Sequence, residues 1–213
     1  MKMKKIIYLL NILVLITATS VFAIEYNPGP YLGGQMGWGR IDEGSGYKQS
    51  MGNTGTTELG TFTGWRAYAG YSFIPFFSVE SGYSYYPVNT YTGTAATIDV
   101  RTYAIDLVGK IILPLKFIKP LSHFSIYGKG GGAYLHTKIT NSSSNMITNG
   151  TIRPTYGAGI IFNFTDNIAV DASWTGVYGR NRINSSDDVA GGSPVPTCNL
   201  FTLGLYYKIT GIF

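Results

Sequence analysis

The chain has 213 residues, of which 13% are charged, 45% are hydrophobic and 15% are aromatic, and it carries 28 glycines and 17 tyrosines. This composition excludes a disordered chain, because disordered segments have few aromatic residues and a high net charge. It also disfavours a helical enzyme, since glycine weakens helix interiors whereas tyrosine and threonine favour strands.

Residues 1–23 have the features of a secretion signal. Three lysines precede an apolar run over residues 6–16, and Val21 and Ala23 stand three residues and one residue before the expected cleavage point. The apolar run is shorter than the ~20 residues that a membrane-spanning anchor needs. We therefore predict a cleaved signal peptide over residues 1–23 and a mature domain over residues 24–213.

Export changes the charge balance of the protein. Removing the signal takes away three of the 16 Lys and Arg and none of the 11 Asp and Glu, which leaves a formal charge of +2. A weakly charged chain lacks the basic surface of a nucleic-acid-binding protein, so no nucleic-acid partner is expected. No later segment has the length of apolar sequence that a transmembrane helix requires.

The mature chain alternates between apolar and small or polar residues, which is the period of a β-strand. Over residues 63–73 one set of alternating positions contains Trp65 and Phe73, and the other contains Arg66 and Tyr68. The next segment repeats the pattern after two residues, which predicts a hairpin with a very short turn. Eight strands are predicted, over residues 30–40, 62–73, 76–86, 98–113, 122–136, 151–164, 168–180 and 199–213.

The links between the predicted strands fall into two kinds. Short or proline-containing links alternate with long polar links over residues 41–61, 87–97, 137–150 and 181–198. Short turns at one end and long loops at the other are typical of an outer-membrane barrel. The apolar positions also carry aromatic residues toward strand ends, as at membrane interfaces: Tyr31, Trp38, Tyr83, Tyr85, Tyr134, Trp174, Tyr178, Tyr207 and Phe213. We predict an all-β, eight-stranded, antiparallel up-and-down transmembrane barrel.

The polar positions of the strands are expected to face the lumen. A charge on the lipid face costs about 2 to 4 kcal/mol for Arg or Lys at the bilayer midplane, so inward orientation is favoured. This orientation predicts a lumen charge network of Arg66, Glu80, Asp106, Lys110, Lys129, Asp171 and Lys208. Because an unpaired buried charge is costly, we expect ion pairs such as Glu80 with Lys110 or Arg66, the alternative being separate charges that line a hydrated cavity.

Several segments resemble the transmembrane domain of OmpA-type outer-membrane proteins. Residues 29–38 resemble the opening strand of that family, and residues 79–83 resemble part of its second hairpin, with Glu80 at the position of a lumen glutamate. Further similar segments occur in order at residues 125–132, 153–159 and 203–208. The resemblance implies the barrel fold and an outer-membrane location, where lipid and lipopolysaccharide surround the protein.

The sequence also departs from the family pattern. Ile161 stands where a lumen glutamate is common, and Asp171 stands where a cation is common, so the lumen network must be rearranged. Because the sequence ends at Phe213, we expect a barrel without the C-terminal peptidoglycan-binding domain of longer relatives. Tyr207, Ile209 and Phe213 resemble the terminal signal that the barrel-assembly machinery recognises.

Motifs that could indicate catalysis are weak. Residues 128–132 are rich in glycine but lack the spacing of a phosphate-binding loop, and strand packing explains them better. His123 and Ser125 have a spacing seen in lipid A deacylases, yet His123 is expected at a periplasmic turn, away from the outer leaflet. Cys198, the single cysteine, is expected in a loop, and His136 is expected at the start of one. No catalytic residue, metal site or cofactor is predicted.

Three functions remain after these exclusions. The first is a structural barrel whose loops over residues 41–61, 87–97, 137–150 and 181–198 contact a host or surface ligand, since binding commonly resides on loops held by a rigid frame. The second is a small channel for ions or apolar solutes, which the filled interior of eight strands disfavours. The third is a lipid A-modifying hydrolase, which the missing catalytic residues disfavour.

Overall fold

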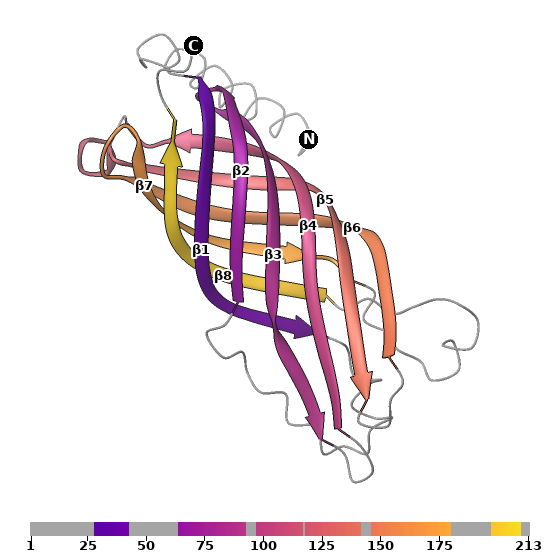
Figure 1. Ribbon diagram of the computed structural model, residues 1–213. Coiled ribbons are helices and arrows are strands. Elements are labelled where there is room, and N and C mark those ends of the chain that lie inside the picture. The colour runs from indigo at the N-terminus through magenta and orange to yellow at the C-terminus, as the bar shows by residue number, and fades with distance from the viewer. Residues whose placement is uncertain are drawn as a thin grey trace, which may run out of the picture.

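The computed structural model describes residues 28–42, 64–92, 97–116, 118–141, 146–179 and 197–209, which form eight strands (Figure 1). The strands are β1 Gly29–Asp42, β2 Gly64–Ile74, β3 Phe77–Thr92, β4 Thr97–Pro114, β5 Phe124–Asn141, β6 Met146–Asn163, β7 Ile168–Val177 and β8 Thr197–Lys208. A 3-10 helix, η2 (Lys119–Leu121), lies between β4 and β5. The predicted number and order of strands are confirmed.

The strands close into a barrel in which each pairs antiparallel with the next and β8 pairs with β1. The closing pair begins with Tyr31 opposite Lys208 and ends with Asp42 opposite Thr197. Closure gives every strand a hydrogen-bonded neighbour on both sides, which a membrane-spanning sheet needs because lipid offers no partner for an unpaired edge. The predicted up-and-down barrel is therefore the observed fold.

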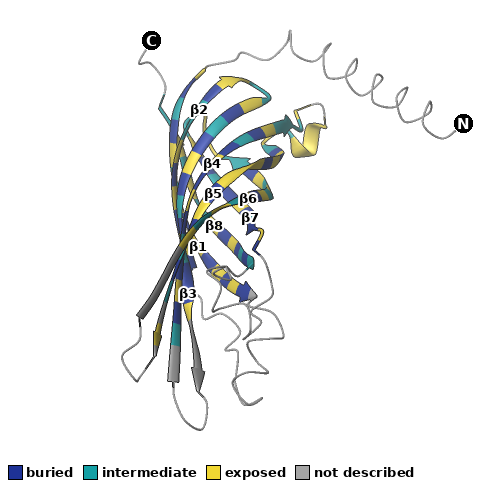
Figure 2. Ribbon diagram, turned by 90° about the vertical axis from the view of Figure 1, so that its right-hand side faces the viewer, coloured by how far each residue is buried: buried dark blue, intermediate teal, exposed yellow. Residues whose placement is uncertain are grey.

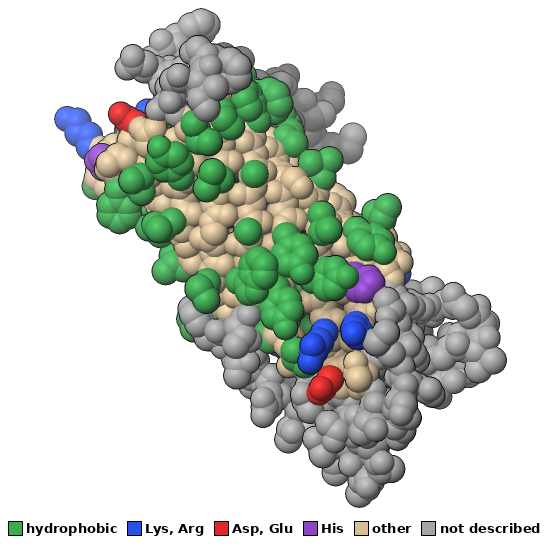
Figure 3. Space-filling model, viewed as in Figure 1, with side chains coloured by type: hydrophobic (Ala, Val, Ile, Leu, Met, Phe, Trp, Pro, Cys, Tyr) green, Lys and Arg blue, Asp and Glu red, His purple; other side chains and the backbone are tan. Residues whose placement is uncertain are grey.

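Side chains alternate between the lumen and the outer surface along each strand, as the striped burial pattern shows (Figure 2). In β2, Arg66 and Tyr68 are buried, whereas Trp65 and Phe73 are exposed. Apolar side chains cover the outside of the barrel (Figure 3). They include Leu32, Met36, Ile105, Leu107, Ile111, Ile126, Ile152, Ile160, Leu203 and Leu205. An apolar outer face is the arrangement that a bilayer requires.

The two ends of the barrel differ. The turn end holds the connections over residues 75–76, 115–123 and 164–167, together with the start of β1 and the end of β8. At the opposite loop end, β3, β4, β5 and β6 reach farther than the other strands (Figure 1). Short turns face the periplasm in barrels of this kind, so the loop end faces the exterior.

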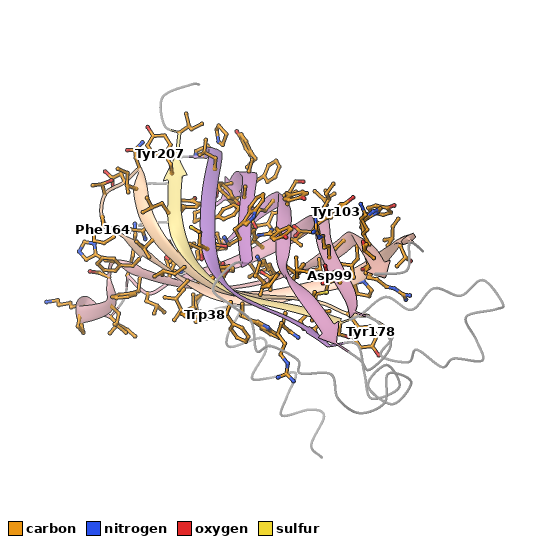
Figure 4. All side chains as sticks on the ribbon, turned by 60° about the horizontal axis from the view of Figure 1, so that its bottom comes forward. Trp38, Asp99, Tyr103, Phe164, Tyr178 and Tyr207 are labelled. Carbon is orange, nitrogen blue, oxygen red and sulfur yellow. The ribbon has the colours of Figure 1, made fainter. Side chains whose placement is uncertain are left out.

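Aromatic residues mark both ends of the outer surface. Phe164 and Tyr207 lie at the turn end, and Tyr103 and Tyr178 lie toward the loop end (Figure 4). Tyr31 is an exception to the prediction, because it is 2% exposed and points into the lumen. The outward-facing Trp38 lies seven positions farther along β1, and an odd spacing places two side chains of one regular strand on opposite faces.

Two of the predicted long loops are mostly strand. β3 continues to Thr92 and β4 begins at Thr97, so most of the segment over residues 87–97 is strand. Pro87 does not end β3, because the register shifts between Tyr86 and Asn89 and pairing then resumes. Such an irregularity tolerates a residue without an N–H donor.

The segment over residues 137–150 is likewise mostly strand, since β5 continues to Asn141 and β6 begins at Met146. Its threonines have high strand propensity. His136 consequently lies within β5, and Cys198 lies within β8, where it is buried. The predicted signal over residues 1–23 and Phe213 lie outside the described residues, as do most of the loops over residues 41–61 and 181–198.

Candidate functional site

Six of the seven charged side chains expected in the lumen lie together in the middle of the barrel. Each is 7% exposed or less, and they come from five strands. We call this group the charged layer: Arg66, Glu80, Asp106, Lys110, Lys129 and Asp171. It contains three cations and three anions. The seventh residue, Lys208, is the last residue of β8 and is only partly buried, so it lies at the rim of the turn end.

Arg66 is held by two carboxylates and a hydroxyl. Its guanidinium donates to both carboxylate oxygens of Asp106 and to Oε1 of Glu80, which lies at 3.0 Å. Nη1 also donates to the Ser84 hydroxyl at 2.9 Å. Gly82 makes room for this arrangement, because a Cβ atom there would overlap the guanidinium. A fork of N–H donors on a carboxylate fixes both groups in position.

Glu80 connects all three cations of the charged layer. Besides Arg66, its carboxylate lies 3.4 Å from Nζ of Lys110 and 3.8 Å from Nζ of Lys129. The Tyr31 hydroxyl donates to Oε2 of Glu80 at 3.2 Å. This contact explains the inward position of Tyr31, since a buried phenol needs a hydrogen-bond partner and a carboxylate provides one.

Asp171 is the second centre of the layer. It accepts hydrogen bonds from the hydroxyls of Tyr68 at 2.9 Å and Tyr127 at 2.8 Å, and Nζ of Lys110 lies 3.8 Å from its carboxylate. The Lys110 ammonium also lies 3.8 Å from the centroid of the Tyr127 ring. Lys110 is therefore attracted by two carboxylates and by the face of an aromatic ring.

Glycines on the neighbouring strands provide space for these tyrosines. A Cβ atom at Gly33 would overlap the ring of Tyr68, and one at Gly159 would overlap the ring of Tyr127. The large side chains thus lie across the lumen over strand positions that have no side chain. Glycine in a strand commonly marks such a close approach.

Two apolar clusters lie on either side of the charged layer. On the loop side, β1, β3, β4, β5, β7 and β8 contribute the loop-side cluster of Ile41, Tyr86, Ala104, Ala133, Leu135, Val177, Cys198 and Leu200. On the turn side, Tyr127, Ile161 and Ala169 pack with Ile112 and Tyr206. Ile161 therefore belongs to an apolar cluster and not to the ion network.

A neutral hydrogen-bonded group joins the charged layer to the loop-side cluster. The Gln35 amide donates to the backbone carbonyl of Asp171 at 3.2 Å, and its Oε1 accepts from Ser173 and Thr202. The sequence pattern assigns no contact to Gln35, Ser84, Tyr68 or Tyr127, and it groups Tyr31 with the outward-facing aromatic residues. The alternation along the strands is a signal that could have found these five residues, because each of them occupies an inward-facing position.

Other candidates for chemistry lie apart from one another. His123 is exposed in the turn before β5, whereas Ser125 is buried. Both lie at the turn end. The glycine-rich segment over residues 128–132 is part of β5. Within the described residues, no group of His, Cys, Asp and Glu could hold a metal ion, and no helix is long and apolar enough to cross a membrane.

Comparison with known proteins identifies the family. The model of the outer membrane protein beta-barrel domain matches residues 9–208. The chain belongs to this family. Its resemblance to OmpA-type barrels is thereby confirmed, and the protein is located in the outer membrane.

Relatives of this outer membrane β-barrel have been found by sequence and by structure. An uncharacterized protein of Coxiella burnetii is 30% identical, over 93% of this chain and 98% of its own length. Neisserial surface protein A has a TM-score of 0.57 at 15% identity, covering 86% of this chain and 100% of that one. Ail of Yersinia pestis, the attachment invasion locus protein, has a TM-score of 0.50 at 15% identity, covering 87% and 100%. These structural likenesses show the shared barrel fold.

Proposed function

We propose that this outer-membrane barrel is a closed scaffold that holds an interaction surface at its loop end. The observation that carries the proposal is the filling of the lumen, in which a paired charged layer lies between two apolar clusters. Eight strands enclose an interior that side chains can fill. A barrel built in this way spans the membrane without offering a continuous path for water.

The charged layer supports closure because its charges satisfy one another. The three cations and three anions balance, and ion pairs connect Glu80 to Arg66, Lys110 and Lys129. A buried charge that loses its partner is strongly destabilised. Opening a pore through the layer would separate these pairs, so the closed state is favoured.

Conductance in planar lipid bilayers tests closure. The folded protein is expected to give no discrete conductance steps in concentrated KCl, while a wide-pored porin added to the same bilayer serves as the positive control. Regular unitary steps from the purified barrel would contradict the closed scaffold. They would favour the alternative of a small channel for ions or apolar solutes.

A lipid A-modifying hydrolase is a weaker proposal. A nucleophile needs its base within hydrogen-bond reach. Ser125 is buried and His123 is exposed, and both lie at the end opposite to the outer leaflet. Deacylation of lipid A by the purified protein, lost in His123→Ala, would restore this alternative.

The interaction surface is assigned to the connections of the loop end, over residues 43–63, 93–96, 142–145 and 180–196. A rigid closed frame is suited to hold such loops for a host or surface ligand. Replacing residues 43–63 and 180–196 by short Gly-Ser linkers should abolish adhesion of displaying cells to cultured epithelial cells. Folding is checked by heat-modifiable migration in gels. Unchanged adhesion by a correctly folded variant would contradict this assignment.

Export and assembly are part of the same proposal. The signal over residues 1–23 should be removed, which the mass of the mature protein can test. We assign Tyr207, Ile209 and Phe213 to recognition by the barrel-assembly machinery. Tyr207 is exposed at the end of β8, where Ile209 donates its backbone N–H to Pro30 O at 2.9 Å. Phe213→Ala should lower the amount of folded barrel in outer-membrane fractions without altering the fold of refolded protein.

A further inference from the structure

The outer surface of β4 and β5 carries a group of basic residues near the loop end. Arg101 lies directly opposite Lys138 in the strand pair, and Tyr103 lies opposite His136. All four occupy outward-facing positions, and Arg101 is exposed. Lys and Arg side chains lie beside a histidine below the oily surface in Figure 3. Like charges directly opposite each other on one face of a sheet repel, so an anion bound between them would stabilise this pair.

An acidic neighbour is also present on this surface. Asp99 precedes Arg101 by two residues on the same face of β4, near the start of the strand at the loop end, and pairs with Thr140 (Figure 4). Asp99 offsets only one of the two positive charges of Arg101 and Lys138, so a net positive charge remains.

Aromatic rings place the group at the membrane interface. Trp65, Tyr85, Tyr103 and His136 lie opposite one another in turn across β2 to β5. The ring centroids of Trp65 and Tyr85 are 6.1 Å apart, and those of Tyr103 and His136 are 4.6 Å apart. Amphipathic rings collect where hydrocarbon meets the polar headgroups, so this row marks the outer interface.

The distribution of charged residues along the outer face of β5 agrees with a position of this aromatic row at the outer interface. Outward positions from Ile126 to Tyr134 carry no charge. They span roughly 20 Å along the membrane normal at about 3.3 Å per residue and a tilt of about 40°. Lys138 lies four residues beyond Tyr134 and therefore at the level of the headgroups of the outer leaflet.

We propose that Arg101, Lys138 and His136 form a binding site for the phosphate groups of the phosphorylated glycolipid of the outer leaflet. The proposal deepens the proposed function and rests on it, because it requires the loop end of the barrel to face the exterior. Side chains at directly opposite strand positions have Cβ atoms about 5 Å apart, so both cations reach one phosphate. Arginine binds phosphate oxygens through two parallel N–H donors, and lysine adds a point charge.

The stacking of His136 on Tyr103 adds a third donor in a fixed place. The interplanar angle of the two rings is 23°, which holds the imidazole beside the lysine two residues farther along β5. A rigid donor loses less conformational freedom on binding than a flexible one. The site thus combines two flexible cations with one ring whose position is set by packing.

Binding of purified lipid A to the full mature barrel in detergent micelles tests the proposal. The double variant Arg101→Gln with Lys138→Gln should bind bisphosphorylated lipid A about tenfold more weakly, because it loses two charge-assisted contacts. The matched control is Arg40→Gln with Lys119→Gln, which removes two exposed cations from other parts of the surface and should bind as the wild type does. Heat-modifiable migration confirms that each variant is folded.

Two further ligands identify the source of the phosphate. Dephosphorylated lipid A should bind the wild type as weakly as bisphosphorylated lipid A binds the double variant, and inorganic phosphate should compete only at millimolar concentration. Equal affinity of the double variant and the wild type would overturn the site, and so would equal binding of the two lipid A forms. Inorganic phosphate that binds as tightly as lipid A would overturn the lipid as ligand. A conducting barrel would contradict the proposed function alone, because conductance does not involve the outer surface.

Discussion

The lumen of this barrel is filled in two different ways, and the comparison between them shows what each kind of filling requires. In the charged layer, Arg66, Glu80 and Asp171 are fixed by hydrogen bonds with defined donors and acceptors. In the loop-side cluster, side chains such as Leu135 and Leu200 are completely buried and held by contact alone. Directional bonds fix which residue may stand at a position, whereas apolar packing fixes mainly its size.

The difference implies unequal responses to substitution. Losing one member of the charged layer leaves its partners buried and unpaired, so the cost includes their desolvation. Losing part of an apolar side chain leaves a cavity, whose cost depends on how far the neighbours relax. Variants matched in chemistry separate these costs, with stability measured as the urea midpoint in lipid vesicles by tryptophan fluorescence.

The largest effect is expected for Arg66→Met. The change leaves Asp106 without its two guanidinium bonds and Glu80 without one of its three cations, which should cost about 3 to 5 kcal/mol. Arg40→Met is the control, because Arg40 is exposed on the outer face of β1. Equal urea midpoints for the two variants would show that the ion network does not hold the barrel together.

The next effect is expected for Leu200→Ala in the loop-side cluster. Leu200 is completely buried, so truncation should destabilise the barrel by about 2 to 4 kcal/mol through lost burial and a cavity. Leu203→Ala on the same strand provides the comparison, since Leu203 is 59% exposed on the lipid face. If both variants lose the same stability, the loop-side cluster is not a packed interior.

A smaller effect is expected for Gly33→Ala. The added methyl group would overlap the Tyr68 ring and displace its hydroxyl from Asp171, at a cost of about 1 to 3 kcal/mol. Gly34→Ala is the matched control, because nothing lies within 4 Å of a Cβ atom at Gly34. A stability of Gly33→Ala equal to that of Gly34→Ala would mean that Tyr68 does not need this space.

The fold follows from the sequence because strand alternation is a local property. A residue every second position faces lipid, so inward positions such as Arg66 and Glu80 can be assigned before any pairing is known. The contacts between them depend on register. Arg66 lies opposite Ser84, and Asp106 lies opposite Gly82, so the bond between Arg66 and Asp106 crosses β3 diagonally.

The errors have equally specific causes. Residue type alone groups Tyr31 with the interfacial aromatics, although its position in the alternation places it inside with Glu80. Pro87 suggests the end of a strand, but a change of register allows β3 to continue. The polar sequence before Cys198 predicts a loop, whereas its side chain completes the loop-side cluster.

The smallest effects are expected for two buried tyrosine hydroxyls, one bonded to the charged layer and one in the loop-side cluster. The Tyr68 hydroxyl donates to Asp171 at 2.9 Å, so Tyr68→Phe should cost about 1 to 2 kcal/mol. The Tyr86 hydroxyl lies in the loop-side cluster with no hydrogen-bond partner among the described residues. Tyr86→Phe removes a buried polar atom from apolar surroundings and should leave the urea midpoint unchanged or raise it. A loss in Tyr86→Phe as large as that in Tyr68→Phe would show that Tyr86 is hydrogen-bonded and that the loop-side cluster is held by polar contacts as well.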